Sequence, residues 1–336
     1  MKIISIFLLL SLNQALAQWQ IQSSGTTASF RGVAAVDANV CWASGSKGTI
    51  LRTIDGGKSW QIIAVPNAEN LDFRDIEAWD DQNAVIMSAG EAEKGAAKIY
   101  KTKDGGKSWQ LVFESTQKGI FLDGLAFWNR KNGLAFSDPI EGKLVVLKTK
   151  DGGNTWQKIP ADALPMMEKG EAAFAASGTS IMVQGNKKAW ICTGGSQAAR
   201  VIFTENKGKT WRVSPTPISA NQSTGLFGIR FIDANKGIAV GGDYAEIQKD
   251  IPNVAITNNG GKTWTLAGHT NPVGLKEGIG LVGNRWIAVG PSGTSFSIDF
   301  GVTWQVINQG SFHAISCAGQ TCWAVGGKGV VAKWEE

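Results

Sequence analysis

The sequence is poor in the residues that build metal, redox and nucleophilic centres. Its 336 residues include only four cysteines and two histidines, and 18% of them are charged. It has no Cys-x-x-Cys motif, no haem-attachment motif and no dinucleotide-binding fingerprint after an expected strand. We therefore expect no cofactor and no bound metal.

Clusters of basic residues are also missing. The formal net charge is +5, and it falls to +4 when Lys2 in the N-terminal segment is left out. The lysines and arginines are spread along the chain, whereas nucleic-acid binding needs a basic patch or stripe. The sequence gives no reason to expect a nucleic-acid partner.

Long apolar runs are absent except near the N-terminus. Lys2 precedes the apolar residues 3–12, and Ala15-Leu16-Ala17 follows them. This pattern is typical of a secretory signal peptide cleaved after Ala17, and the apolar run is too short to span a bilayer. We expect residues 1–17 to be a signal peptide and residues 18–336 to be exported, periplasmic or extracellular, with no membrane span.

One eight-residue phrase, in contrast, occurs six times, and it has the chemistry of a β-turn. An Asp or Asn at its third position accepts backbone N–H bonds, glycines allow positive φ, and a final Trp opens the next strand. The phrases read TIDGGKSW, TKDGGKSW, TKDGGNTW, TENKGKTW, TNNGGKTW and SIDFGVTW, and their third residues are Asp55, Asp104, Asp151, Asn206, Asn259 and Asp299. Each phrase offers at most one acid, so we interpret these residues as structural and not as calcium ligands.

Three more strands accompany each phrase. In the first unit they are the alternating stretch FRGVAAV, the small-residue stretch CWASG and the stretch GTILRT, which runs into the eight-residue phrase, called the box from here on. Four short strands with glycine-rich turns predict a propeller blade, and their repetition every 40 to 55 residues predicts a ring of blades. The fold class is therefore an all-β propeller of four-stranded blades.

The number of blades follows from the two ends of the chain. The last unit, residues 322–336, has no box and no fourth strand, whereas Trp19 stands where a Trp follows a box elsewhere. We predict one seven-bladed domain over residues 18–336, in which the N-terminal strand completes the last blade and removes an exposed sheet edge. We expect a monomer.

The four cysteines allow one local disulfide. Cys317 and Cys322 flank AGQT at an expected hairpin, close enough to face each other, and both the bridged and the free state remain open. Cys41 and Cys192 occupy small-residue strands and are expected to be buried thiols.

The boxes resemble those of the BNR or Asp-box propellers over nearly all of residues 18–336, and specifically the branch related to photosystem II stability and assembly factors. FSDPIEGK, GEAAFAASGTS and VGGDYAE resemble a subgroup of exported bacterial proteins sometimes labelled oxidoreductases. No cofactor motif supports that label. The resemblance implies a chaperone-like protein binder, although sialidases and pure binding proteins share the box, so it specifies fold better than function.

A ligand site is expected where the first strands enter the channel. Aligning these strands places one residue per blade in an equivalent slot, with the blade-four residue one position away: Arg31, Arg74, Asp123, Glu171, Phe227, Glu277 and His313. Turns on the same face add Asp138, Asp243, Tyr244 and Ser292. The slot varies chemically while the framework is uniform, which favours a tailored pocket with a cationic arc of His313, Arg31 and Arg74 opposite an acidic one.

Each of these residues also has a structural interpretation. Arg31 and Arg74 can pair with neighbouring carboxylates as solvated ions, and His313 can hold a structural hydrogen bond. Asp138 and Asp243 are natural turn caps. Tyr244 opens the longest insertion between second and third strands, which favours a functional loop.

Two classes of function remain at this point. The first is non-enzymatic binding or scaffolding of a protein, peptide or glycan at the channel mouth. The second is a sialidase-like glycoside hydrolase or lyase acting on acidic glycans, with arginines for the substrate carboxylate and Tyr244 paired with Glu246 as nucleophile. The missing third slot arginine, and the lack of a G-x-S-x-G elbow to accompany His313, favour binding.

Overall fold

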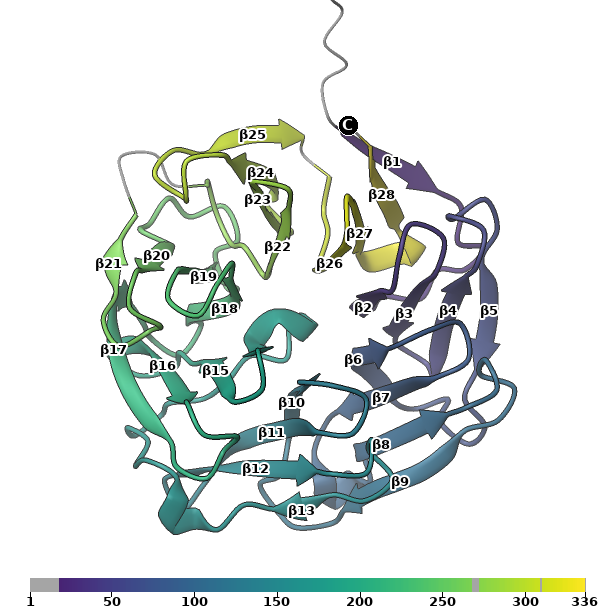
Figure 1. Ribbon diagram of the computed structural model, residues 1–336, viewed down its shortest axis with the longest axis horizontal. Coiled ribbons are helices and arrows are strands. Elements are labelled where there is room, and N and C mark those ends of the chain that lie inside the picture. The colour runs from purple at the N-terminus through teal and green to yellow at the C-terminus, as the bar shows by residue number, and fades with distance from the viewer. Residues whose placement is uncertain (1–17, 268–271, 309, 336) are drawn as a thin grey trace, which may run out of the picture.

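The computed structural model shows a ring of seven antiparallel sheets around a central channel (Figure 1). It describes residues 18–267, 272–308 and 310–335, so the expected signal peptide lies outside the described residues. Each sheet has four strands, as predicted. The helical segments of these described residues are four short 3-10 helices, η1 (Ala92–Lys94), η2 (Ala161–Ala163), η3 (Gly178–Ser180) and η4 (Gly327–Gly329).

The strands of each blade follow one another from the channel outward, except in blade seven. Blade one contains β2 (Phe30–Ala35), β3 (Cys41–Gly45), β4 (Thr49–Thr53) and β5 (Gln61–Ala64), and blade two β6 (Asp72–Ala78), β7 (Ala84–Ala89), β8 (Ala97–Thr102) and β9 (Gln110–Ser115). Blade three contains β10 (Leu122–Phe127), β11 (Gly133–Ile140), β12 (Lys143–Thr149) and β13 (Gln157–Lys158), and blade four β14 (Ile181–Gln184), β15 (Lys188–Cys192), β16 (Ala198–Thr204) and β17 (Arg212–Ser219). Blade five contains β18 (Thr224–Phe231), β19 (Gly237–Asp243), β20 (Val254–Thr257) and β21 (Thr265–Leu266), and blade six β22 (Gly278–Val282), β23 (Arg285–Gly290), β24 (Gly293–Ser297) and β25 (Gln305–Asn308).

Blade seven combines the two ends of the chain. It contains β26 (Ala314–Ala318), β27 (Thr321–Val325), β28 (Val331–Glu335) and, as its outer strand, β1 (Gln18–Gln22). Figure 1 shows the purple N-terminal strand beside the yellow C-terminal strand, and Trp19 is paired with Trp334. The indole of Trp19 is 6% exposed and donates to Thr294 Oγ1 at 3.1 Å. The predicted ring closure is confirmed.

The six boxes form the same turn, with one set of hydrogen bonds. In the first box Asp55 accepts from the backbone N–H of Ser59 at 2.9 Å and from its hydroxyl at 2.5 Å. These bonds to Ser59 lower the pKa of Asp55 to about 2. Asn259 reproduces the arrangement with its amide, accepting from the N–H of Thr263 and donating to its hydroxyl. Gly56 and Gly57 have φ of 75° and 84°, which explains the glycine pair.

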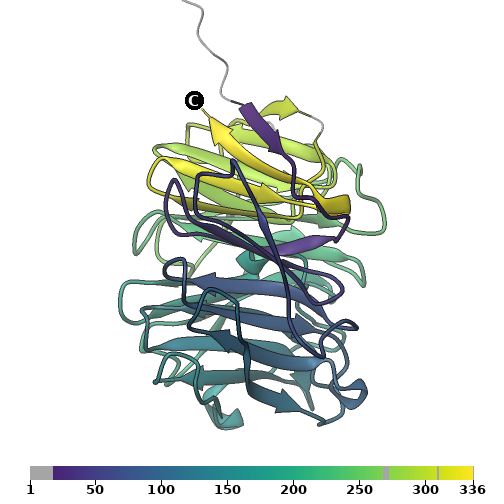
Figure 2. The same ribbon diagram turned by 90° about the vertical axis from the view of Figure 1, so that its right-hand side faces the viewer.

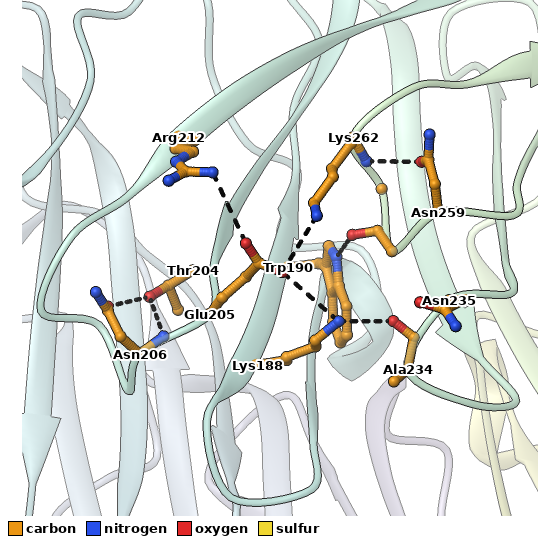
Figure 3. A network of polar contacts seen from close by, with 12 residues as sticks. Lys188, Trp190, Thr204, Glu205, Asn206, Arg212, Ala234, Asn235, Asn259 and Lys262 are labelled. Carbon is orange, nitrogen blue, oxygen red and sulfur yellow. Dashed lines mark hydrogen bonds and ion pairs between the residues drawn. The ribbon is translucent and has the colours of Figure 1, made fainter.

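The blades are joined by apolar side chains and by cations that reach the next blade. Trp42, Trp190 and Trp323 on the second strands are fully buried between sheets. Lys101 Nζ donates to the carbonyl of Gly152 at 2.6 Å, in the box of the following blade. Figure 2 shows the stacked blades from the side, and Figure 3 shows a similar contact at Lys188, which donates to Ala234 O at 2.8 Å.

The four cysteines form one disulfide, which the sequence spacing allows, and two free thiols. In the structure Cys317 and Cys322 form a disulfide across the β26–β27 hairpin, with Cα atoms 4.0 Å apart. Cys41 and Cys192 are buried free thiols. Within the described residues no helix has the length and apolar character needed to cross a membrane.

Candidate functional site

Eight of the predicted residues line one cavity at the channel mouth. Its volume is about 610 Å³. The predicted residues in its wall are Arg31, Arg74, Asp123, Asp138, Tyr244, Glu277 and His313, and Phe227 joins them from the same slot. The alignment of first strands therefore brought together side chains from blades one, two, three, five, six and seven.

β-bulges explain why the slot residues turn toward the cavity. The pairing of first and second strands skips one residue in four blades, at Arg31, Arg74, Asp123 and Phe227. A bulge leaves the extra residue outside the ladder and bends the strand, which re-aims its side chain. The same backbone irregularity thus presents a cation, an acid or a ring, according to the residue.

Glu171, which the alignment places one position from the slot in blade four, is not among the residues that line this cavity. The inner strand of blade four, β14, begins only at Ile181, ten residues after Glu171. Glu171 is buried away from the cavity, where it accepts from Arg200 Nε at 3.0 Å and from Thr193 Oγ1 at 2.6 Å. A buried acid paired with arginine is a structural link between segments of this blade.

Asp243 and Ser292 also lie outside the cavity wall. Asp243 caps its own turn by accepting from Ala245 N at 2.9 Å, and Lys249 Nζ lies 3.7 Å from its carboxylate. Ser292 Oγ donates to Leu275 O at 2.7 Å and contacts Lys276 Nζ at 2.7 Å. Both residues support the turns on this face, in line with the turn-cap interpretation for Asp243.

A loop of blade four closes the channel beneath the cavity. This plug, residues 172–180, includes η3 and lies near the centre of the ring (Figure 1). Arg31 Nη1 donates to Ala176 O at 3.1 Å, and Arg74 Nη1 donates to Ala175 O at 3.3 Å. The two slot arginines therefore also hold the plug. Sequence reasoning missed this role, although the small-residue stretch GEAAFAASGTS was an available signal.

The cationic arc carries its own counter-ions. Glu277 Oε2 lies 2.5 Å from His313 Nδ1 and 3.6 Å from Arg31 Nη1. Arg74 Nε donates to Asp72 Oδ2 at 2.8 Å. The arc is therefore a paired network at the rim, and an incoming carboxylate would compete with Glu277 and Asp72 for these donors.

The two carboxyl groups opposite the cationic arc, those of Asp123 and Asp138, have raised pKa values. Asp123 is 1% exposed, and burial together with the nearby Asp138 raises its pKa well above the usual range. Burial also raises the pKa of Asp138 to about 6, although Ala173 N–H donates to its Oδ1 at 3.0 Å. In the described part of the chain, Asp123 Oδ2 has no hydrogen-bond partner. Burial thus favours the protonated form of the Asp123 carboxyl group over the ionised form.

Aromatic rings form the third side of the cavity. Phe174 of the plug stacks on Phe227 with centroids 4.3 Å apart, and Tyr244 meets Phe174 edge-on at 5.7 Å. Tyr244 remains 49% exposed. Ile247 and Leu275 extend this apolar wall. The cavity combines an exposed apolar surface with a rim of paired charges.

The residues proposed for glycosidase chemistry are not paired. The hydroxyl of Tyr244 donates to Gln222 O at 3.3 Å. Glu246 accepts from Lys249 Nζ at 2.7 Å instead of approaching the tyrosine. Within the described residues no group of three metal-ligating side chains occurs.

Comparisons with known proteins bear on the fold and its family. The model of a family described as photosynthesis system II assembly factor YCF48 matches residues 12–118. No curated protein matches the chain. Among solved structures, YCF48 bound to a D1 peptide is 16% identical, with 95% of each chain covered and a TM-score of 0.63.

Two further structures share the architecture. YCF48 from Cyanidioschyzon merolae is 17% identical over 94% of this chain and 98% of that chain, with a TM-score of 0.65. A catalytically inactive virginiamycin B lyase from Staphylococcus aureus, solved with quinupristin, is 12% identical over 95% and 99%, with a TM-score of 0.66. At these sequence identities the three structures show the fold alone, and one of the three is a lyase. The chain has the fold of a seven-bladed β-propeller, and its residues 12–118 are similar to the family described as photosynthesis system II assembly factor YCF48.

Proposed function

We propose that this protein is an exported, monomeric, non-enzymatic propeller that binds a peptide or an exposed segment of a partner protein at the channel mouth. The observation that carries the proposal is the composition of the 610 Å³ cavity, in which an aromatic wall, exposed at Tyr244, faces a rim of paired arginines. Such a surface suits a segment with an apolar side chain and a nearby carboxylate. The YCF48 structure with a D1 peptide supports a peptide as the ligand class.

The arginines give the site its polar specificity. Two guanidinium groups can fork onto carboxylate oxygens, which lysines cannot do. Arg31 and Arg74 are each anchored through one nitrogen to the plug, so the donors are held in place before a ligand arrives. Pre-ordered donors lose less conformational entropy on binding than free side chains would.

A displayed library of random peptides with free carboxyl termini tests this proposal. We expect the parent protein to enrich peptides with an acidic group beside apolar residues, and the variant Arg31→Gln/Arg74→Gln to lose that enrichment in a salt-sensitive manner. Tyr244→Ala, which leaves the arginines in place, should lose selection for the apolar residue. Arg130→Gln/Arg212→Gln is the matched control, because both of these arginines are exposed and neither lines the cavity.

Two results would contradict the proposal. One is equal enrichment by the parent and by both cavity variants, which would place binding elsewhere. The other is the absence of any enriched peptide together with retention of acidic oligosaccharides on a glycan array. That second result would favour the glycan alternative and reopen the question of hydrolysis.

A further inference from the structure

A second cavity lies in the channel below the plug. Its volume is about 260 Å³, far above the roughly 30 Å³ that one water molecule occupies in the liquid. Gly178 and Thr179 of the plug line its upper end. Its lower lining includes Ala35, Ala78 and Phe127, the last residues of their inner strands. It therefore faces the side of the ring that carries the boxes, away from the channel-mouth cavity.

Opposite charges face this lower cavity from two sides of the ring. Glu77 projects from β6 of blade two, and Arg230 projects from β18 of blade five. The Nε–H of Arg230 is shielded from solvent and has no hydrogen-bond partner among the residues that the structure describes. A buried donor without a partner costs free energy, so such a group in a native channel points to a ligand or water that satisfies it.

Glu77 and its neighbour Asp75 are acids that line this cavity, and Asp75 has a structural task. Asp75 accepts the N–H of Leu125 at 2.7 Å and of Ile76 at 2.8 Å, which ties blade two to blade three. Burial, with the added repulsion of Asp75, raises the pKa of Glu77 to about 8, although a hydrogen bond from the backbone N–H of Phe127 and the positive charge of Arg230 act in the opposite direction. A bound cationic group beside Glu77 would lower that pKa again, since an opposite charge favours the ionised carboxyl.

We propose that the lower cavity binds a small zwitterion, such as an amino acid, whose carboxylate faces Arg230 and whose ammonium group faces Glu77. Glu77 and Arg230 attract each other across the cavity, and a ligand with both charges gives each of them a direct partner, whereas a simple anion or cation contacts only one of the two. The remaining wall, with Val33, Ile279 and Ile315, is apolar and fits the short carbon chain between the charges. This site is independent of peptide binding at the channel mouth.

Methionine methyl NMR reports occupancy of the cavity directly. Met182 lines the lower cavity, and Met166, which is exposed in blade three's loop region, lies outside it and serves as the internal control. The probes are glycine, β-alanine and 4-aminobutyrate, with acetate and methylammonium as single-charge controls. We expect at least one zwitterion to shift the Met182 resonance in a saturable manner, with no shift at Met166.

Two variants test the assigned charges. Arg230→Gln and Glu77→Gln should each weaken binding of that zwitterion about tenfold or more, the cost of one charged hydrogen bond. Arg130→Gln and Glu246→Gln, at exposed sites outside the cavity, should leave it unchanged. Arg230→Lys retains the positive charge but not the guanidinium group. It should bind the zwitterion more weakly than the parent and more tightly than Arg230→Gln, a graded order that a folding defect would not produce.

The proposal is overturned if no zwitterion shifts Met182. It is equally overturned if acetate or methylammonium alone shifts Met182 as strongly as the zwitterions do, because the site would then recognise a single charge. Binding that persists unchanged in folded Arg230→Gln and Glu77→Gln, as judged by their melting temperatures, would also contradict it.

Discussion

At the scale of single residues, the boxes are held by hydrogen bonds between residues that are close together in the sequence. The roles of Asp55, Asp104 and Asn259 follow from turn chemistry, because each accepts the N–H four residues on and no distant contact is needed. The tryptophans that end the boxes are different. Their burial depends on the neighbouring blade, which the repeated phrase does not contain.

The box tryptophans should therefore contribute unequally to stability. Trp264 is 7% exposed and donates to Ser214 Oγ at 3.2 Å, whereas Trp109 is half-buried and its indole N–H has no partner. We expect Trp264→Ala to lower the free energy of unfolding by about 3–5 kcal/mol through cavity formation, and Trp109→Ala to cost less. Chemical denaturation of both variants measures the difference. Equal losses of unfolding free energy would show that burial of the tryptophan does not determine how much each box contributes to stability.

Replacing the box acid with its amide should be tolerated. Asp104→Asn keeps the acceptor for Ser108 N–H, and its amide can donate to the Ser108 hydroxyl as Asn259 does to Thr263. We expect nearly the parental melting temperature for Asp104→Asn, a lower one for Asp104→Ala, and no effect of a calcium chelator on either. A marked loss in Asp104→Asn, or a chelator-dependent melting temperature, would indicate a charged or metal-bound role.

At the scale of elements, the strand pattern was readable where alternation and boxes coincide, and it failed in blade four. There the first strand is β14, and the stretch that was aligned in its place forms the plug. Arg74 and its acceptor Ala175 are 101 residues apart in sequence. A contact of that range depends on the closed ring, so local periodicity carries no signal for it.

The N-terminal strand offers the sharpest test at this scale. Deleting residues 18–24 removes β1, exposes the edge of β28 and unpacks Trp19, whose side chain packs on Phe312 and Trp334 with centroids 5.2 Å away from each. Burial of an aromatic of this size is worth at most about 4–6 kcal/mol by area. We expect a lower melting temperature and aggregation, seen by calorimetry and light scattering. An unchanged, monodisperse truncation would show that the ring does not need β1.

At the scale of the whole molecule, the buried carboxyl groups of the channel should set the response to pH. Burial raises the pKa of Asp75 to about 7, of Glu77 to about 8 and of Asp138 to about 6. Between about pH 4 and pH 8 the folded state therefore binds more protons than the unfolded chain, so stability falls as pH rises through this window. The box acids, whose pKa is lowered, oppose this only below about pH 4.

The melting temperature should consequently be higher at pH 5 than at pH 8. Glu77→Gln should reduce the difference, because its amide does not ionise. Glu246→Gln, an exposed position paired with Lys249, is the matched control and should keep the parental slope. A melting temperature that rises steadily from pH 5 to pH 8 would mean that the channel carboxyl groups are ionised in the folded protein.

The whole-molecule claim is that the channel mouth, and not another face of the ring, receives a polypeptide partner. Site-specific photo-cross-linking from position 244 tests it most directly, because Tyr244 is exposed beside the aromatic wall. Ile298, exposed in the sixth box on the opposite face, is the control position. In native extract we predict cross-links to polypeptide from position 244 that disappear in Arg31→Gln/Arg74→Gln, with none from position 298. Cross-links from position 298 alone, or equal yields with and without the two arginines, would contradict the account.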